Sequence, residues 1–426
     1  MKHAPNTPSA TSLAAQPLNG LTAGLDWAKH DHAVCVVNVT GEVTARFTVE
    51  HTTAGLSTLV RRLAQLNCGE IAIERPDGPV VDALLEAELA VVVISPNQVK
   101  NLRSRYGSAG NKDDRFDAYV LADTLRTDRR RLRALVPDSP STVTLRATCR
   151  ARKDLVRTRV AVANQLRAHL QNAFPAGALL FADVDSDINL AFLTRFTHQG
   201  LADWLSPKRL GHWLQAQGYC GRQNAAQLHA KLLAAPHGVT DDQALARAHI
   251  TLAYVATLQT LKEQIAALDA QIREQLPAHP DSEIFTSLPR SGTVRAARLL
   301  AEIGDCRARF PTPDSLACLA GVAPSTKQSG KARPHVGFRW SCDKQLRDAV
   351  TDFAGDSRRA NPWAAKLYRD ATNRGHDHAH ATRILARAWL FVIWHCWQNG
   401  TAYDPAQHNA LQRVLDEQEK ITRQVA

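Results

Sequence analysis

The sequence lacks several features that mark particular classes of protein. Its eight cysteines are scattered and never form a Cys-x-x-Cys pair, so we expect reduced, mostly buried thiols and neither a zinc site nor a disulfide framework. Residues 1–19 contain no continuous apolar segment, and we interpret them as a flexible tail and not as a signal peptide. The longest apolar stretch, 388–397, is too short to cross a bilayer. We therefore expect a cytoplasmic protein with no membrane partner.

Acidic residues are outnumbered by basic ones. Lys and Arg total 52 against 41 for Asp and Glu, which gives a formal net charge of +11. Such a balance favours an anionic partner, of which DNA or RNA is the commonest, although charge alone is weak support for it. The 44% hydrophobic and 22% charged fractions are typical of a folded protein, and 426 residues suffice for two or three domains.

The N-terminal region has the pattern of an α/β domain. Short β-branched runs alternate with turn signals from Gly24 to Val49, and Asn38, Thr40 and Gly41 mark a hairpin turn. A helix, a strand, a second helix and a second strand are then expected at 56–66, 71–74, 80–89 and 90–96. Antiparallel strands followed by strand, helix and strand are the order of an RNase H-like domain, although periodicity alone would allow other α/β folds.

After Pro137 the sequence becomes helical. Long helices are expected at 142–175 and 242–276, either as an antiparallel coiled-coil arm that also dimerises or as a plain helical bundle. The text SLPRSG followed by TVRAARLLAEIG resembles a helix-hairpin-helix, in which amides at a helix N-terminus can meet a phosphate. The predicted division is a tail, an RNase H-like domain, a helical insert, a mostly helical C-terminal domain and a final helix, at 1–19, 20–135, 136–280, 281–405 and 406–426.

Four carboxylates are the strongest candidates for chemistry. Asp26 and Glu74 each lie at the end of a predicted strand, so neighbouring strands that end together would place both at one edge of the sheet. Asp114 and Asp117 begin a helix, and their spacing puts both on one face. Carboxylate oxygens suit Mg²⁺ or Mn²⁺, and two such ions roughly 4 Å apart can activate the attacking oxygen and stabilise the leaving oxygen of a phosphodiester.

A structural interpretation of the helix acids stays open. Asp113 or Asp114 would then cap the helix, and Asp117 would be a solvated surface charge. Asp113 with Asp117 is an alternative register for the same pair of ligands.

The segment 321–334, GVAPSTKQSGKARP, is a second candidate. A serine that precedes a glycine in a basic loop could present its hydroxyl to a phosphate, with Lys327, Lys331 and Arg333 neutralising charge. Ser-Gly is also a common turn, so the pattern by itself favours a plain loop. Rival hydroxyls belong to Ser291, Ser325 and Ser341.

Basic residues form two rows, one at 126–133 that includes Arg129, Arg130 and Arg131, and one at 146–158. Such rows can follow a phosphate backbone and make binding salt-dependent. The alternative is a solvated helix face. The remaining clusters favour structural roles: a polar loop for His376, His378 and His380, and packing for Trp389, Trp394 and Trp397.

These motifs, in this order, resemble the transposases of the insertion-sequence family IS110. The resemblance rests on GLDWAK, the strand ending in Glu74 with Gly78 after it, KDDRFDA, RAARLLAEIGD, LACLAGVAPSTKQSG and LRDA, at 24–29, 74–78, 112–118, 295–305, 316–330 and 346–349. It covers about 20–135 and 280–400, whereas the middle matches only in helical character. Two segments depart from the common family pattern: PRSG at 289–292 and RWSCDKQLR at 339–347. These departures affect the expected phosphate contact at these segments and not the family resemblance as a whole.

The resemblance implies a specific machinery. Asp26, Glu74, Asp114 and Asp117 would be the DEDD set of an RuvC-like domain that holds Mg²⁺ or Mn²⁺, and Ser329 would attack DNA to form a covalent phosphoserine link. It also implies a structured bridge RNA that pairs with the element ends and the target DNA. Strand exchange at two ends requires at least two active sites, so we expect a dimer or tetramer in the bacterial cytoplasm, at the nucleoid.

Two other functions remain open at this point. One is a metal-dependent nuclease of the junction-resolving type, in which water attacks and no serine is needed. The other is a non-catalytic nucleic-acid-binding protein that kept the fold and lost the chemistry.

Overall fold

The computed structural model describes residues 13–106, 113–240, 242–328 and 335–425. The chain divides into two compact units. The first unit contains the residues up to Asp138 together with Cys306–Pro311, and the second contains Ser139–Asp305 and the residues from Thr312 onward.

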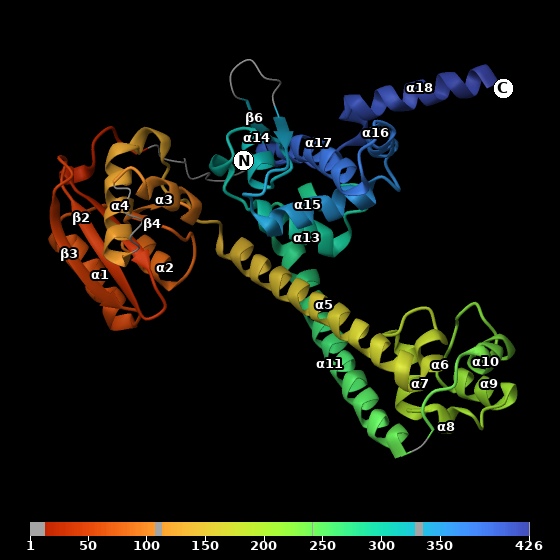
Figure 1. Cartoon of the computed structure of the whole chain (residues 1–426). Helices are drawn as coiled ribbons and strands as arrows, with labels where there is room; N and C mark the ends of the chain where they lie inside the picture. The colour runs from red at the N-terminus through yellow and green to blue at the C-terminus, as the bar shows by residue number, and fades with distance from the viewer. Residues whose placement is uncertain (1–12, 107–112, 241, 329–334, 426) are drawn as a thin grey trace. The chain divides into compact units, whose positions relative to one another are not determined.

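The first unit is built on a five-stranded sheet with the order β3-β2-β1-β4-β5 (Figure 1). Its strands are β1 (Thr22–Trp27), β2 (Asp31–Val37), β3 (Val43–Glu50), β4 (Glu70–Ile73) and β5 (Ala90–Val93). The first three strands pair antiparallel, whereas β4 runs parallel to both β1 and β5. The central strand β1 therefore joins an antiparallel half to a parallel half.

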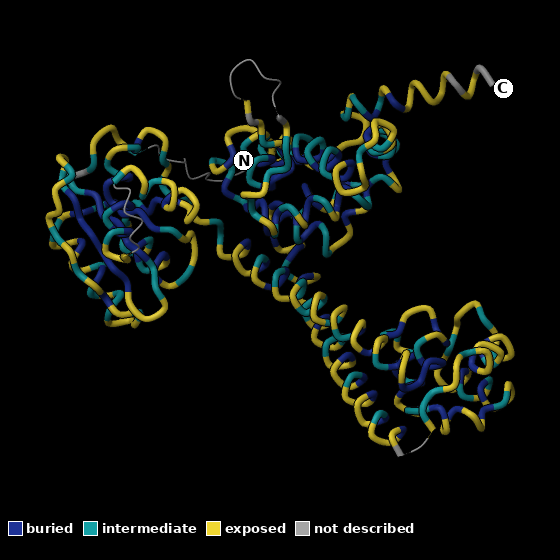
Figure 2. The backbone as a smooth tube through the Cα atoms, viewed as in Figure 1, coloured by how far each residue is buried: buried dark blue, intermediate teal, exposed yellow. Residues whose placement is uncertain are grey.

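Helices cover both faces of this sheet, and the strands β1, β2 and β4 are largely buried between them, whereas the edge strand β3 is mostly exposed (Figure 2). On one face, α1 (Thr53–Gln65) and α2 (Pro79–Glu86) pack against side chains that include Leu25, Ile71 and Ile73. On the other face, α3 (Pro96–Arg103) and α4 (Asp114–Thr127) pack against Ala72 and Val92. Side chains of one strand thus alternate between the two cores.

Helix α4 approaches β1 closely because residue 24 is glycine. A Cβ atom at Gly24 would lie 2.1 Å from the carbonyl oxygen of Ala118, so no larger residue fits without moving the helix. This packing fixes α4 against the strand that carries Asp26.

The second unit is organised around two long helices, α5 (Pro140–Ala173) and α11 (Asp242–Ala278), which match the predicted long helices. They run antiparallel: Thr142 Oγ1 lies 2.8 Å from His279 Nε2 near one end, and His169 Nε2 lies 3.0 Å from Thr251 Oγ1 near the other. Much of the length of this pair is exposed (Figure 2).

The region left unassigned by the sequence, 176–240, folds into short helices with a core of their own. They are α6 (Pro175–Leu179), α7 (Asp187–Arg195), α8 (Gln199–Ala202), α9 (Pro207–Ala216) and α10 (Ala225–Ala234). Their core includes Phe192, Leu210 and Leu228, and it continues onto Leu166 of α5 and Leu258 of α11.

The C-terminal part is also mostly helical. Its elements are α12 (Ser282–Thr286), α13 (Gly292–Ile303), α14 (Pro313–Leu319), β6 (Ser325–Lys327), β7 (His335–Gly337), α15 (Lys344–Ser357), α16 (Pro362–Asn373), α17 (His378–Asn399) and α18 (Asn409–Val425). Trp389 and Trp397 of α17 are fully buried, and the indole nitrogen of Trp389 donates to Ser357 Oγ at 2.8 Å. Both tryptophans therefore serve packing, as predicted.

Short 3₁₀ helices complete the structure, at Leu18–Gly20, Arg129–Arg131, Arg307–Arg309 and Pro405–Gln407. The expected mixed α/β N-terminal region and mostly helical remainder are confirmed. All eight cysteines are free thiols, and four of them are buried. Within the described ranges, none of the helices combines the length and the apolar character needed to span a membrane.

Candidate active site

The register of the sheet brings Asp26 and Glu74 together. In the parallel pair of β1 with β4, Leu25 lies opposite Ile73, so the next residues along each strand are Asp26 and Glu74. Leu25 and Ile73 face the core under α1 and α2, and alternation turns the two acids toward α4. Asp26 is only 9% exposed.

The first turn of α4 separates the roles of its three aspartates. Asp113 is the N-cap, and its carboxylate accepts a hydrogen bond from the Arg115 amide at 3.1 Å. Asp114 is exposed, whereas Asp117 is 1% exposed and is therefore not a solvated surface charge. Of these three aspartates, Asp117 is therefore the one that the structure buries, whereas Asp113 caps the helix and Asp114 is exposed.

Arg103, at the end of α3, completes this cluster. Its Nε donates to Asp117 Oδ1 at 2.5 Å and its Nη2 donates to Asp117 Oδ2, which makes a bidentate ion pair. The Arg103 side chain is 27% exposed, against 2% for that of Asp117. No sequence motif marks Arg103, which lies in the last turn of α3, a short helix that the sequence patterns did not predict.

The electrostatics of Arg103 link three of the four predicted acids. The pKa of Arg103 is raised, first by its hydrogen bond to Asp117, against the opposing effect of burial, and further by the negative charges of Asp117, Glu74 and Asp26. Arg103 is therefore ion-paired with Asp117 of α4 and also feels the charges of Glu74, after β4, and of Asp26 in β1.

The donor atoms of this cluster fit a hard divalent cation. Carboxylate oxygens from separate elements are what Mg²⁺ or Mn²⁺ binds. In the part of the chain that the structure describes, however, no three acidic, histidine or cysteine side chains are arranged as ligands of one ion. Both carboxylate oxygens of Asp117 instead accept hydrogen bonds from the Arg103 guanidinium.

The residues directly after the two strand acids also contact each other. The guanidinium of Arg75 lies 4.7 Å from the ring centroid of Trp27. This contact joins the segment that follows β4 to the end of β1. It thereby helps to keep Glu74 beside Asp26.

One of the expected phosphate contacts is wrong. Arg129 is 4% exposed, its Nη2 donates to Glu70 Oε1 at 2.8 Å, and its Nε donates to the Ala14 carbonyl at 2.9 Å. A guanidinium buried in an ion pair cannot reach a DNA backbone. Its neighbours Arg130 and Arg131 are exposed.

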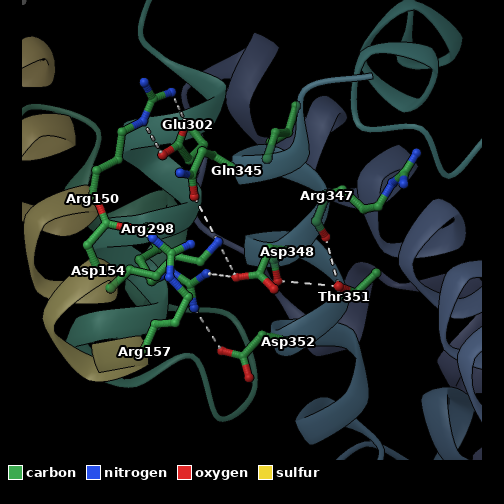
Figure 3. A network of polar contacts seen from close by, with 12 residues as sticks. Arg150, Asp154, Arg157, Arg298, Glu302, Gln345, Arg347, Asp348, Thr351 and Asp352 are labelled. Atoms are coloured by element: carbon green, nitrogen blue, oxygen red, sulfur yellow. Dashed lines mark hydrogen bonds and ion pairs between the residues drawn. The ribbon is translucent and has the colours of Figure 1, made fainter. Parts of the chain in front are cut away.

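The second basic row, 146–158, forms a network inside the second unit (Figure 3). Arg150 pairs with Glu302 of α13, Arg152 with Asp269 of α11, and Lys153 with Asp348 of α15. These side chains hold the long helix α5 to its neighbours. The row is therefore neither a simple solvated face nor a free row of phosphate contacts.

Of the serine candidates, Ser325 begins β6, and Ser341 follows β7 in the segment before α15. Thr326 of β6 lies opposite Val336 of β7 in an antiparallel pair. Ser329, Lys331 and Arg333 lie outside the described residues, as does the side chain of Lys327. Among the rivals, Ser291 is 2% exposed and donates to the Thr286 carbonyl at 3.2 Å, which removes it from contact with DNA.

Comparison with known families gives two matches that together span both ends of the chain. A model of DEDD transposases, described as a transposase, matches residues 23–175, and a model of the transposase IS116/IS110/IS902 family matches residues 282–369. The four predicted acids fall in the first match, and Ser329 falls in the second.

Relatives match over nearly the whole chain. The "Mini-circle putative transposase for IS117" of Streptomyces coelicolor is 32% identical over 399 residues, which cover 89% of this chain and 94% of the relative. An insertion element IS900 protein of Mycobacterium paratuberculosis is 28% identical over 93% of this chain and 99% of its own. An insertion element IS110 protein of Streptomyces coelicolor is 28% identical over 69% and 72%. The chain belongs to the IS110 family of insertion-sequence transposases, which are DNA-recombining enzymes.

Proposed function

We propose that this transposase cleaves and exchanges DNA strands with an acidic site in an RNase H-like domain and a serine nucleophile in its C-terminal part. The observation that carries the proposal is the register of β1 with β4, which places Asp26 and Glu74 at neighbouring strand ends, together with the buried Asp117 of α4 in its ion pair with Arg103. The order of three antiparallel strands followed by two parallel ones supports an RNase H-like domain.

Asp26, Glu74 and Asp117, with Asp114 as the fourth acid, would hold Mg²⁺ or Mn²⁺. The bound ion would neutralise the phosphate and polarise its oxygens. Asp117 can turn to such a ligand only when Arg103 releases it. Arg103 is already partly exposed, so it can then direct its charge to a DNA phosphate.

Ser329 is the proposed nucleophile. Its Oγ forms a bond to phosphorus, the bond from phosphorus to the sugar oxygen breaks, and the proton lost by the serine ends on the departing sugar oxygen. Lys327, Lys331 and Arg333 would neutralise the phosphate, and Arg130 and Arg131 would contact the DNA backbone elsewhere. The motif in the second matched region supports this assignment.

The proposed partners follow from strand exchange in this family. They are the element ends, a target DNA and a structured bridge RNA, and the working form is a dimer or tetramer that acts at the bacterial nucleoid. Acids and serine of one site could come from different subunits, because two ends are processed together.

The test is capture of a covalent intermediate. Wild-type protein with element-end DNA, target DNA, the bridge RNA and Mg²⁺ should give a protein–DNA adduct on a denaturing gel, and peptide mapping should place it on Ser329. Ser329→Ala should form no adduct, whereas Ser341→Ala, a change at a nearby exposed serine, should form it normally. Full cleavage by Ser329→Ala would instead identify a nuclease that uses water.

A further inference from the structure

Trp340 is the most exposed large hydrophobic residue in the described ranges, with 81% of its surface accessible. Other tryptophans of this part of the chain, such as Trp389 and Trp397, are completely buried. Trp340 lies in the segment between β7 and α15, which is also where the sequence departs from the common family text. Tryptophan is enriched at binding interfaces, because its ring joins a large apolar area to a polar N–H group.

The ring of Trp340 is supported from below by Phe338. The two ring centroids are 4.8 Å apart with an interplanar angle of 83°, which is an edge-to-face contact. Phe338 is itself held by two guanidiniums, with Arg347 at 4.4 Å and Arg383 at 4.7 Å from its ring centroid. The exposed indole therefore stands on a built platform and not on an unsupported loop.

The platform is anchored to the fold. Arg347 donates to the Ala320 carbonyl at 3.4 Å and also to the Arg339 carbonyl. The side chain of Arg339, next to Trp340, donates to the Ala323 and Pro324 carbonyls, each at 3.3 Å. These bonds tie the segment 338–340 to the residues just before β6.

The surroundings of the ring are strongly cationic. Arg339, Arg347 and Arg383 all lie at the platform, and their acceptors are backbone carbonyls and the Phe338 ring. Burial lowers the pKa of Arg383 below its usual value, the negative charge of Asp377 opposes this shift, and the positive charge of Arg347 adds to it. An anion bound here would relieve the repulsion between these guanidiniums.

We propose that Trp340 is a stacking platform for an unpaired base of the DNA strand, with Arg339, Arg347 and Arg383 facing the adjoining phosphates. An aromatic face beside several guanidiniums is the combination that binds single-stranded nucleic acid, because every base has a π-face and every linkage has a charge. Strand exchange produces unpaired bases at the cut. The inference deepens the proposed function in that it rests on DNA as the substrate, but it requires neither Ser329 nor a metal.

Trp204 provides a matched control within the same chain. It is 49% exposed, and the guanidinium of Arg209 lies 4.7 Å from its ring, so it shares the chemistry of an exposed indole beside an arginine. It belongs to the small helical region between α8 and α9, and it is not part of the platform built on Phe338.

The experiment measures binding of full-length protein to three fluorescent probes of equal length: oligo-dT, oligo-U and a blunt DNA duplex. Base stacking on an aromatic residue contributes about 1–3 kcal/mol, so Trp340→Ala should weaken oligo-dT binding roughly 5-fold to 150-fold. Trp340→Phe should keep most of the affinity. Trp204→Ala should bind like wild type, and duplex binding should change little in any variant. Thermal unfolding of each variant checks that the exposed position does not affect the fold.

Crosslinking gives an independent result. Oligo-dT with one 5-iodouracil should crosslink on irradiation to the peptide that contains Trp340. Unchanged oligo-dT affinity in Trp340→Ala, an equal loss for duplex, or an equal loss in Trp204→Ala would overturn the inference. A loss confined to oligo-U would overturn the assignment to DNA.

The same probes separate this inference from the proposed nucleophile. Adding Trp340→Ala to the Ser329→Ala protein should weaken its oligo-dT binding by the same factor as in the wild-type background. If wild-type protein forms no covalent adduct while the Trp340 effect persists, the serine mechanism fails and the stacking platform stands.

Discussion

The two ends of strand β4 each place a carboxylate beside an arginine, yet the two arrangements differ. At the start of the strand, Glu70 and Arg129 form a closed pair whose side chains are 5% and 4% exposed. At the other end, Glu74 lies in a cluster in which one partly exposed guanidinium, Arg103, is influenced by three carboxylates. The first arrangement is a closed pair of one acid with one arginine, whereas in the second several carboxylates act on one partly exposed arginine, and we propose this second cluster as the cation site. The number and accessibility of the charges, and not the residue types, distinguish them.

The largest effect is expected from the carboxylate cluster. Asp26→Asn removes a charged ligand that is proposed to stabilise the transition state by several kcal/mol, so strand cleavage should fall about a thousandfold or more. Cleavage of element-end DNA by single-turnover kinetics measures this. Asp31→Asn, at an exposed position of the neighbouring strand β2, should cleave normally. If Asp26→Asn cleaved DNA at the wild-type rate, the cluster near Glu74 would have no catalytic role and would not differ in function from the ion pair at Glu70.

Loss of the ion pair between Glu70 and Arg129 should lower the stability of the protein and leave DNA binding unchanged. Arg129→Met leaves Glu70 buried without its partner and should lower the free energy of unfolding by about 3–5 kcal/mol. Urea unfolding measures this, and adding Glu70→Leu should recover much of the loss. The salt dependence of DNA affinity should stay as in wild type, whereas Arg130→Ala should reduce its slope by about one. A reduced slope for Arg129→Met would restore Arg129 as a phosphate contact.

A substitution of Arg103 tests whether the carboxylate cluster of Asp26, Glu74 and Asp117 accepts a metal ion. Arg103→Gln removes the charge-assisted hydrogen bonds to Asp117 and should destabilise the metal-free protein by about 2 kcal/mol. Added Mg²⁺ should restore more stability to this variant than to wild type, because the ion no longer competes with the guanidinium. Urea unfolding with and without Mg²⁺ measures both effects. Arg105→Gln is the exposed control. If Mg²⁺ raised the free energy of unfolding equally in Arg103→Gln and wild type, Mg²⁺ and the Arg103 guanidinium would not compete for Asp117.

The smallest effect is expected from the contact between Arg75 and Trp27. Its loss in Arg75→Gln removes about 0.5–1 kcal/mol of cation–π energy and loosens Glu74, so Mn²⁺ affinity should fall roughly 2-fold to 5-fold. Titration calorimetry with Mn²⁺ measures it. Arg75 also pairs with Asp77 at 3.5 Å, and Asp77→Asn separates the two contacts because it should leave Mn²⁺ affinity unchanged.

Much of the fold follows from local sequence patterns. The leucine spacing predicted a helix at 56–66, and the structure has one at Thr53–Gln65, since an amphipathic face needs only one apolar surface to pack on. The region 176–240 was not predictable in this way. Its short helices are defined by a shared core that includes Phe192 and Leu210, and such a core is a property of the assembled chain.

The candidate site was predicted only in part, because local patterns place residues along strands and helices but do not show which residues meet when the chain folds. The strand and helix positions of Asp26, Glu74 and Asp117 could be inferred from local patterns. Arg103 was missed because it contacts Asp117 only through packing of α3 beside α4. Arg129 was misjudged because a run of three arginines conceals which side chain turns inward.

The sequence by itself determined the family of this protein, the positions of its acids along strands and helix, and its cationic character, because these depend on residue type and spacing. Only the tertiary structure decided which charges balance one another. Whether an acid at one end of β4 is a closed ion pair or part of a cation site depends on helices that reach it from elsewhere in the chain. Burial and partner geometry set the energy of a charge, and both arise only when the chain has folded.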